Sequence, residues 1–109
     1  MATIYKVLGQ VATTATTTAT LYTVPAGTSA VVSTIAVCNL GSLSSTFRVA
    51  VQPAGAVLTN KHYLNFNTTI PSNDTIFLTI GVTLATTDLV SVYASTGTLN
   101  FSMFGSEIS

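Results

Sequence analysis

Short stretches in which hydrophobic and polar residues alternate run through most of the chain, and turn-forming residues separate them. An alternation with a period of two is typical of strands with one buried face, and threonine, valine and aromatic residues favour this conformation. The pattern predicts strands at residues 4–8, 20–24, 30–39, 46–52, 61–66, 75–83, 89–95 and 98–104. No segment has the periodicity of a helix, so we expect the chain to be all-β.

The alternation also assigns strand faces and a core. In the strand at 30–39, Val31, Ile35 and Val37 share one face, and the opposite face is only weakly polar. This strand is therefore expected to be central and covered on both sides. The residues expected to fill the core are Phe47, Val49, Val51, Ile76, Leu78, Val90, Val92, Leu99 and Phe101.

About eight strands, spaced roughly a dozen residues apart and without crossover helices, indicate an antiparallel architecture. We expect an antiparallel β-sandwich, jelly-roll-like, in a single domain. The Pro-Ala-Gly turn occurs at 25–27 and again at 53–55. Three residues are too few to indicate a duplication, so we interpret both copies as similar turn chemistry.

An alanine- and threonine-rich tract covers residues 11–20. Threonine disfavours helix, and the tract lacks the glycine and serine of a flexible linker, so it is expected to be extended. Ten extended residues span roughly 33 Å, which is enough to reach a neighbouring subunit. We therefore expect residues 1–19 to form an N-terminal strand and an extended arm, and residues 20–109 to form the sandwich. The alternative is a loop or edge strand that packs on its own domain.

The composition indicates a folded protein that associates with other subunits. Only 6% of the 109 residues are charged, the formal net charge is zero, and the mean hydropathy is +0.61. Disorder requires low hydropathy and high net charge, which this chain lacks. Because so few charges oppose self-association, a symmetric homo-oligomer is expected, with a trimer as the first choice.

The same composition argues against two kinds of partner. The cations are Lys6, Arg48 and Lys61, which are scattered along the chain and form no basic patch for nucleic acid. No apolar run approaches the roughly 18 residues of a membrane span, and the first ten residues lack a secretory signal. The chain is expected to be made in a cytoplasm and to contact neither nucleic acid nor membrane. Cys38 lies in an apolar run and is expected to be a small buried residue.

Candidate catalytic chemistry is sparse. A nucleophilic triad would need His62 together with Asp74, Asp88 or Glu107, and no G-x-S-x-G motif accompanies them. We expect His62 to lie at a sheet rim or a subunit contact, and both aspartates to cap turns. No metal-ligand spacing is present, although His62 from several subunits would form a site if they met on a symmetry axis. No catalytic residue, cofactor or metal is therefore expected.

Several segments are distinctive when taken together. They are YKVLGQ at 5–10, LYTVPAGTSAVVSTIAVCN at 21–39, TFRVAVQPAGA at 46–56, KHYLNF at 61–66, IPSNDT at 70–75, VSVYAS at 90–95 and FSMFGSEIS at 101–109. This set resembles a family of small virion structural proteins of tailed bacteriophages, in particular those of cyanophages. The resemblance covers nearly the whole chain and is most specific over TVPAGTSAVVSTIAVCN and FRVAVQPAG. It implies a particle component and carries over no catalytic residue.

The resemblance and the composition lead to the same functional expectation. The chain is expected to be a capsid decoration, or cement, protein in the virion that contacts other copies of itself and the major capsid protein or another virion protein. A tail, baseplate, neck or fibre-associated protein is the alternative within the particle. A host-surface carbohydrate-binding module is a third hypothesis, but it predicts aromatic residues in loops, whereas the aromatic residues mostly fall in predicted strands. An enzyme is not expected.

Overall fold

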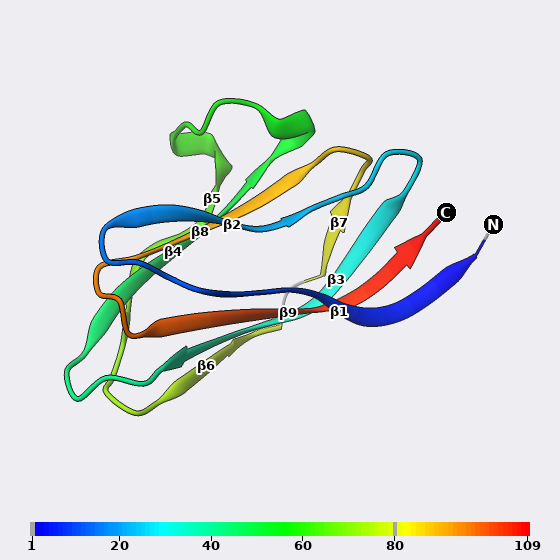
Figure 1. Cartoon of the computed structure of the whole chain (residues 1–109). Coiled ribbons are helices and arrows are strands. Elements are labelled where there is room, and N and C mark those ends of the chain that lie inside the picture. Colours follow the sequence, from blue (N-terminus) through cyan, green and yellow to red (C-terminus); the bar gives the residue numbers. More distant parts are fainter. Residues whose placement is uncertain (1, 80) are drawn as a thin grey trace.

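The structure, a computed structural model, describes residues 2–79 and 81–109. Within these ranges the secondary structure is almost entirely β (Figure 1). The strands are β1 (Thr3–Ala12), β2 (Thr17–Thr23), β3 (Ser29–Asn39), β4 (Ser45–Gln52), β5 (Tyr63–Ile70), β6 (Thr75–Leu78), β7 (Val82–Leu84), β8 (Leu89–Ala94) and β9 (Leu99–Ile108). Two single-turn 3-10 helices, η1 (Pro53–Gly55) and η2 (Asn60–His62), lie in the connection between β4 and β5.

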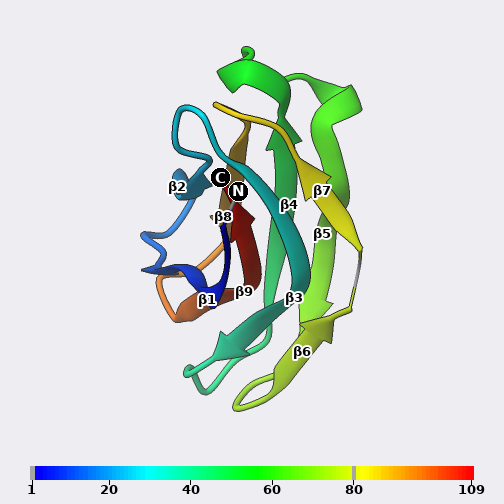
Figure 2. The same cartoon turned by 90° about the vertical axis from the view of Figure 1, so that its right-hand side faces the viewer.

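The strands form two antiparallel sheets that pack face to face (Figure 2). Sheet A has the order β1-β9-β3-β6, with β7 also paired to β3, and sheet B has the order β2-β8-β4-β5. With β6 and β7 counted as one interrupted strand, this order of eight strands is that of a jelly roll. The expected sandwich fold is confirmed. The two ends of the chain lie side by side (Figure 1), joined by backbone hydrogen bonds between Ala2 and Ser109.

The expected strands all have counterparts, but several differ in extent, and β1 and β9 run four residues further than expected, to Ala12 and Ile108. The strand expected at 61–66 begins only at Tyr63, because residues 60–62 form η2. The strand expected at 75–83 consists of two parts, β6 and β7, which pair with different ends of β3. Their pairing registers with β3 differ by one residue, as happens when one strand carries an extra residue. Residue 80, which the expected strand includes, lies outside the described residues.

The core lies between the two sheets and includes six of the nine residues that were expected to fill it, together with buried residues outside that set such as Leu21, Ile70 and Leu84. Phe47 from sheet B and Phe101 from sheet A are fully buried, and their rings meet edge to face with centroids 6.0 Å apart. This geometry is the favoured one for aromatic pairs. Val49, Val90, Val92 and Leu99 are also buried, whereas Val51, Ile76 and Leu78 are partly buried and pack against this core.

The face assignment in the first half of β3 was wrong. Val31 is exposed and Val32 is buried, because the pairing with β9 shifts between Val32 and Thr34. This β-bulge adds one residue and reverses the alternation on one side of it. Ile35 and Val37, which follow the bulge, are buried as expected.

The expectation that β3 is covered on both faces was also wrong. The strand is central in sheet A, with β9 on one side and β6 and β7 on the other. Its outer face, however, includes the exposed Val31 and the half-buried Thr34, Ala36 and Cys38. Cys38 is therefore not the buried core residue that was expected. Burial within the domain therefore does not explain why the outer face of β3 is only weakly polar.

The structure corrects the expected arm at residues 1–19. Val11 and Ala12 end β1 and pair with β9, while Thr17 begins β2 and pairs with β8. Between them, Thr13 is buried, and both its backbone N–H and its hydroxyl donate to the carbonyl of Leu99 at 3.1 Å. The tract therefore crosses from sheet A to sheet B inside one domain. The same β-propensity that predicted an extended arm is satisfied by partners in the chain's own sheets.

Candidate interaction surface

His62 stabilises a turn. It ends η2, is 7% exposed, and its Nδ1 accepts a hydrogen bond from the backbone N–H of Thr59 at 3.0 Å. This contact completes a capping box around the single turn of η2. The ring nitrogen that a general base would need is thus occupied by a backbone donor.

The two aspartates cap turns, as the sequence predicted. Asp74 Oδ1 accepts from the backbone N–H of Thr75 at 2.8 Å. Asp88 accepts from two backbone donors, Ala85 N–H at 2.9 Å and Ala54 N–H at 2.8 Å. Asp88 therefore holds its own turn and also ties that turn to η1. Neither carboxylate forms a hydrogen bond with His62 among the residues that the structure describes, so the predicted triad candidates are not brought together.

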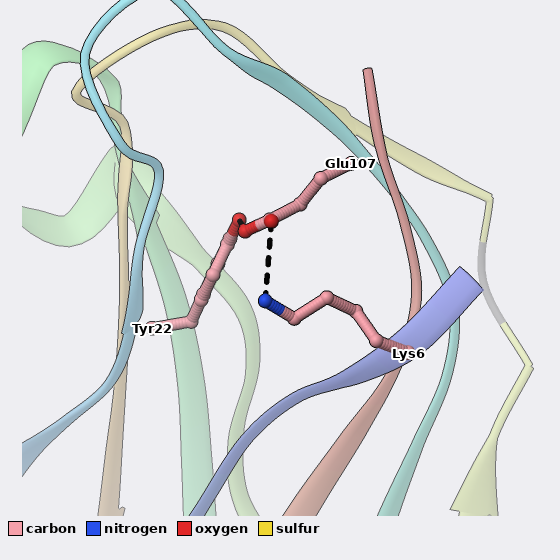
Figure 3. Close-up of polar contacts among 3 residues, drawn as sticks. All are labelled: Lys6, Tyr22 and Glu107. Atoms are coloured by element: carbon pink, nitrogen blue, oxygen red, sulfur yellow. Dashed lines mark hydrogen bonds and ion pairs between the residues drawn. The ribbon is translucent and has the colours of Figure 1, made fainter. Parts of the chain in front are cut away.

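Glu107 forms a polar cluster that sequence analysis missed (Figure 3). The hydroxyl of Tyr22, on β2, donates to Glu107 Oε2, and Lys6 Nζ, on β1, donates to Glu107 Oε1 at 3.2 Å. Tyr22 belongs to sheet B, whereas Lys6 and Glu107 belong to sheet A. The cluster therefore joins the two sheets. Its members are far apart in sequence, so no local pattern could have identified them.

The pKa shifts in this cluster favour a fixed charge distribution. Burial raises the pKa of the Tyr22 phenol above its usual range, and the hydrogen bond to Glu107 and the charge of Glu107 raise it further. The hydrogen bond from Tyr22 lowers the pKa of the Glu107 carboxyl; burial opposes this shift, and Lys6 reinforces it. Because the two pKa values move apart, Tyr22 stays protonated and Glu107 stays ionised at neutral pH. The cluster acts as a structural clamp between the sheets.

Neither a metal-binding cluster nor a membrane-spanning helix is found in the part of the chain that the structure describes. No group of three or more His, Cys, Asp or Glu residues within 2–79 and 81–109 is arranged to hold a metal ion. No helix in those ranges is long and apolar enough to cross a membrane.

The outer surface of sheet A carries an apolar patch, which we call the apolar face. Its members are Tyr5, Val7, Val31, Phe77 and Phe104. Tyr5 is 85% exposed and Phe77 is 66% exposed, and the other three are each more than a third exposed. These side chains share one side of the sheet, because Val7 lies opposite Phe104 while Tyr5 and Val31 both lie opposite Ser106. Tyr5, Val31 and Phe104 also line one shallow groove.

Small and hydroxylated residues separate the members of the apolar face. Thr34, Ala36, Ser102 and Ser106 occupy the positions between them. Phe77 joins the patch through Ala36, its partner on β3. The result is a broad β surface on which hydrophobic and neutral polar groups mix. Such a surface suits contact with another protein, because burying it removes apolar area from water without desolvating charges.

The sequence interpretation placed the aromatic residues mostly in strands, but several of them do not contribute to the core. Phe66, Phe77 and Phe104 lie in strands as expected, but their side chains are on outer sheet faces. A signal was present in the alternation itself. Phe104 is out of phase with Leu99, Phe101 and Met103, which are all buried.

Comparisons with known proteins identify a fold and no family. No protein-family model matches the chain. No curated protein matches it either. One solved structure that it resembles is that of the infectious bursal disease virus Gx strain, with 10% sequence identity and a TM-score of 0.59. The alignment covers 97% of this chain but only 32% of that chain, so the present chain spans about a third of its neighbour's length. The likeness shows that this β-sandwich fold is shared with a protein of a virus particle.

Proposed function

We propose that the chain is a structural protein of a virus particle, and specifically a capsid decoration protein of a tailed bacteriophage. The apolar face of sheet A carries this proposal. A domain of 11.2 kDa that exposes Tyr5, Val7, Val31, Phe77 and Phe104 on one sheet has a surface suited to a permanent partner. The proposed partners are other copies of the chain, arranged as a trimer, and a capsid protein beneath them.

The intramolecular contacts of the charged side chains support the same proposal. Glu107 and Lys6 form an ion pair with each other within the domain, and Asp74 and Asp88 accept hydrogen bonds from backbone amides. Few charges remain to keep copies apart in solution. Contacts through the apolar face would be made by shape, apolar burial and neutral hydrogen bonds, which suits a subunit that is added once to a particle and stays there.

The fold likeness is consistent with this function. A chain in the structure of the infectious bursal disease virus Gx strain contains a region of the same architecture. Fold alone does not define function, so the likeness supports a virion role only together with the exposed apolar face and the resemblance of the sequence to phage structural proteins. Such a protein would be made in the host cytoplasm and added to the particle during assembly.

The self-association part of the proposal is tested with a double variant, Tyr5→Thr with Phe77→Thr. Threonine keeps the β-propensity of these exposed strand positions but removes most of the apolar area. We expect the wild type to sediment as a homo-oligomer at micromolar concentration. The double variant should need at least a tenfold higher concentration to associate.

The matched control is Leu43→Thr with Val57→Thr, which removes two exposed apolar side chains outside the strands, 77% and 84% exposed respectively. The control should associate as the wild type does. A wild type that remains monomeric at 100 µM and fails to attach to particles would refute the proposed assembly. Equal weakening by both double variants would show that the apolar face is not the contact.

The location on the particle needs a separate measurement. Antibodies against the chain, applied to intact particles and viewed by electron microscopy, should label the head surface at regular positions. Labelling of the tail or baseplate would reject decoration of the capsid and support the alternative particle component. Absence of the chain from purified particles would refute the virion role altogether.

A further inference from the structure

A second surface, on the outer side of sheet B, combines a cation with aromatic rings. The guanidinium of Arg48, on β4, lies between the rings of Phe66, on β5, and Tyr93, on β8. Its Cζ atom is 4.1 Å from the Phe66 centroid and 4.2 Å from the Tyr93 centroid. Tyr63 adds a further ring, edge to face with Phe66 at 4.9 Å. We call these four residues the arginine–aromatic cluster.

An irregular backbone builds this cluster. Asn67 has a φ of 53°, and the pairing of β4 with β5 changes register on both sides of Val49. Phe66 stacks on Arg48, and the next residue, Asn67, accepts a hydrogen bond from Arg48 Nε at 2.8 Å. In a regular strand, consecutive side chains point to opposite faces. The left-handed residue therefore brings two neighbouring side chains to the same guanidinium, a type of strain that gathers at functional sites.

Arg48 is half-buried, and its side-chain hydrogen bond is made by Nε. Aromatic rings lie on both sides of the guanidinium, and Asn67 occupies Nε. Within the part of the chain that the structure describes, its two terminal amino groups form no hydrogen bond. The three carboxylates of the sequence are bound to other partners. Arg48 is thus a positioned cation without an acidic partner in its own chain.

This geometry selects the chemistry of a ligand. An arginine whose plane is fixed between rings loses little freedom when it binds, and its two terminal amino groups match the two oxygens of a carboxylate. Next to it, Phe66 is 53% exposed and lines a hollow with Tyr63 and Asn60. An exposed ring beside an amide suits the apolar face and hydroxyls of a pyranose. Carboxylate and sugar ring would therefore be recognised side by side.

We propose that the arginine–aromatic cluster binds a carboxylated sugar unit of an acidic polysaccharide. Arg48 takes the carboxylate edge-on through its terminal amino groups, Phe66 and Tyr63 pack on the ring, and Asn60 donates to a hydroxyl. This site is on sheet B and is separate from the apolar face of sheet A. The chain would then be able to contact an acidic glycan while its other sheet faces a protein partner.

The test is a titration with trigalacturonic acid, followed by 1H–15N NMR at 150 mM salt. We expect saturable shifts of the Arg48 Nε–H signal and of the backbone amides of Tyr63 and Phe66. The methyl ester of the same trisaccharide, which keeps the rings but loses the charges, should bind at least tenfold more weakly. A tetraglutamate peptide, which has the charges without the rings, should also bind at least tenfold more weakly.

Variants locate the site. Arg48→Lys keeps the charge but loses the planar fork, and it should weaken binding at least fivefold. Phe66→Leu should weaken binding while leaving the cation in place. Lys61→Gln, which removes a cation outside the cluster, should change the affinity less than twofold. The 1H–15N spectra confirm that each variant is folded.

Three outcomes would overturn the proposal. The first is the absence of any shift with trigalacturonic acid at 10 mM. The second is equal binding of the methyl ester or of the acidic peptide. The third is a Lys61→Gln effect as large as that of Arg48→Lys, which would indicate attraction by net charge alone.

Discussion

At the residue scale, two phenylalanines in the same sheet differ in burial. Phe101 is fully buried against Phe47, whereas Phe77 is 66% exposed on the apolar face. We expect Phe101→Ala to lower the free energy of unfolding by about 3–5 kcal/mol, because it removes a core ring and leaves a cavity. Urea denaturation monitored by circular dichroism measures the loss.

The control for this prediction is Phe77→Ala, measured at a concentration where the protein is dissociated. Its cost should be below about 1 kcal/mol, because the side chain is mostly solvated. A loss below about 1 kcal/mol for Phe101→Ala would mean that the assigned face of β9 is wrong.

Also at the residue scale, the clamp of Tyr22, Glu107 and Lys6 predicts a pH dependence. The pKa of Glu107 is lowered on folding, so its contribution is present above the ordinary carboxyl pKa of about 4.3 and is lost as the pH falls through the folded pKa. The pKa of Tyr22 is raised on folding, so its contribution is present below about pH 10 and is lost as the pH rises towards the folded pKa.

Tyr22→Phe tests this dependence. It removes a hydrogen bond to a charged acceptor and should lower the free energy of unfolding by about 1.5–3 kcal/mol at pH 7. The difference between wild type and variant should shrink both below pH 4 and above pH 10. Thermal unfolding measured from pH 3 to pH 11 gives this difference directly, and a difference that is constant over that range would contradict the clamp.

At the element scale, the β-bulge in β3 depends on a close backbone approach at Gly105. A Cβ atom on Gly105 would lie 2.0 Å from the carbonyl oxygen of Val31. Gly105→Ala must therefore displace β3 from β9, and we expect it to lower stability by at least about 2 kcal/mol. The control is Gly81→Ala, where a Cβ would meet no heavy atom within 4 Å. Equal stability of both variants in urea denaturation would show that the two strands are not this close.

The tract at residues 11–20 gives a second prediction at the element scale. Deleting residues 12–19 removes the turn and the start of β2, an edge strand of sheet B. We expect the shortened chain to lose its β circular dichroism spectrum and its cooperative unfolding transition. Replacing the exposed Thr14 and Ala15 by glycine should leave the fold intact. A folded shortened domain that no longer associates would restore the idea of an arm between subunits.

At the scale of the whole molecule, the scarcity of charge predicts how the proposed assembly responds to salt. Its contacts would be apolar and neutral, so raising sodium chloride from 0.1 to 1 M should change the dissociation constant of the oligomer less than threefold. Sedimentation at both salt concentrations measures this change. Dissociation of the oligomer, or release from particles, at moderate salt would indicate instead that charged contacts hold the assembly.

The sequence by itself determined the fold class and part of the core. Alternation identified Phe47 and Phe101 as inward-facing, and the positions of Asp74 and Asp88 ahead of apolar strands predicted their capping roles. These features were predictable because they depend on residues close together in the chain. A hydrophobic alternation with a period of two indicates a strand with one buried face. An aspartate that caps a turn accepts hydrogen bonds from backbone amides within a few residues of itself.

Only the tertiary structure decided which strands become neighbours and which side chains come together on each sheet face. It made the tract at 11–20 the crossing from sheet A to sheet B, exposed Val31 through a bulge, and stacked Arg48 between rings from β5 and β8. Each outcome depends on partners distant in sequence, because a strand pattern specifies two faces but not what covers them. A bulge inverts the faces without changing the local pattern, since it is set by the register of the neighbouring strand.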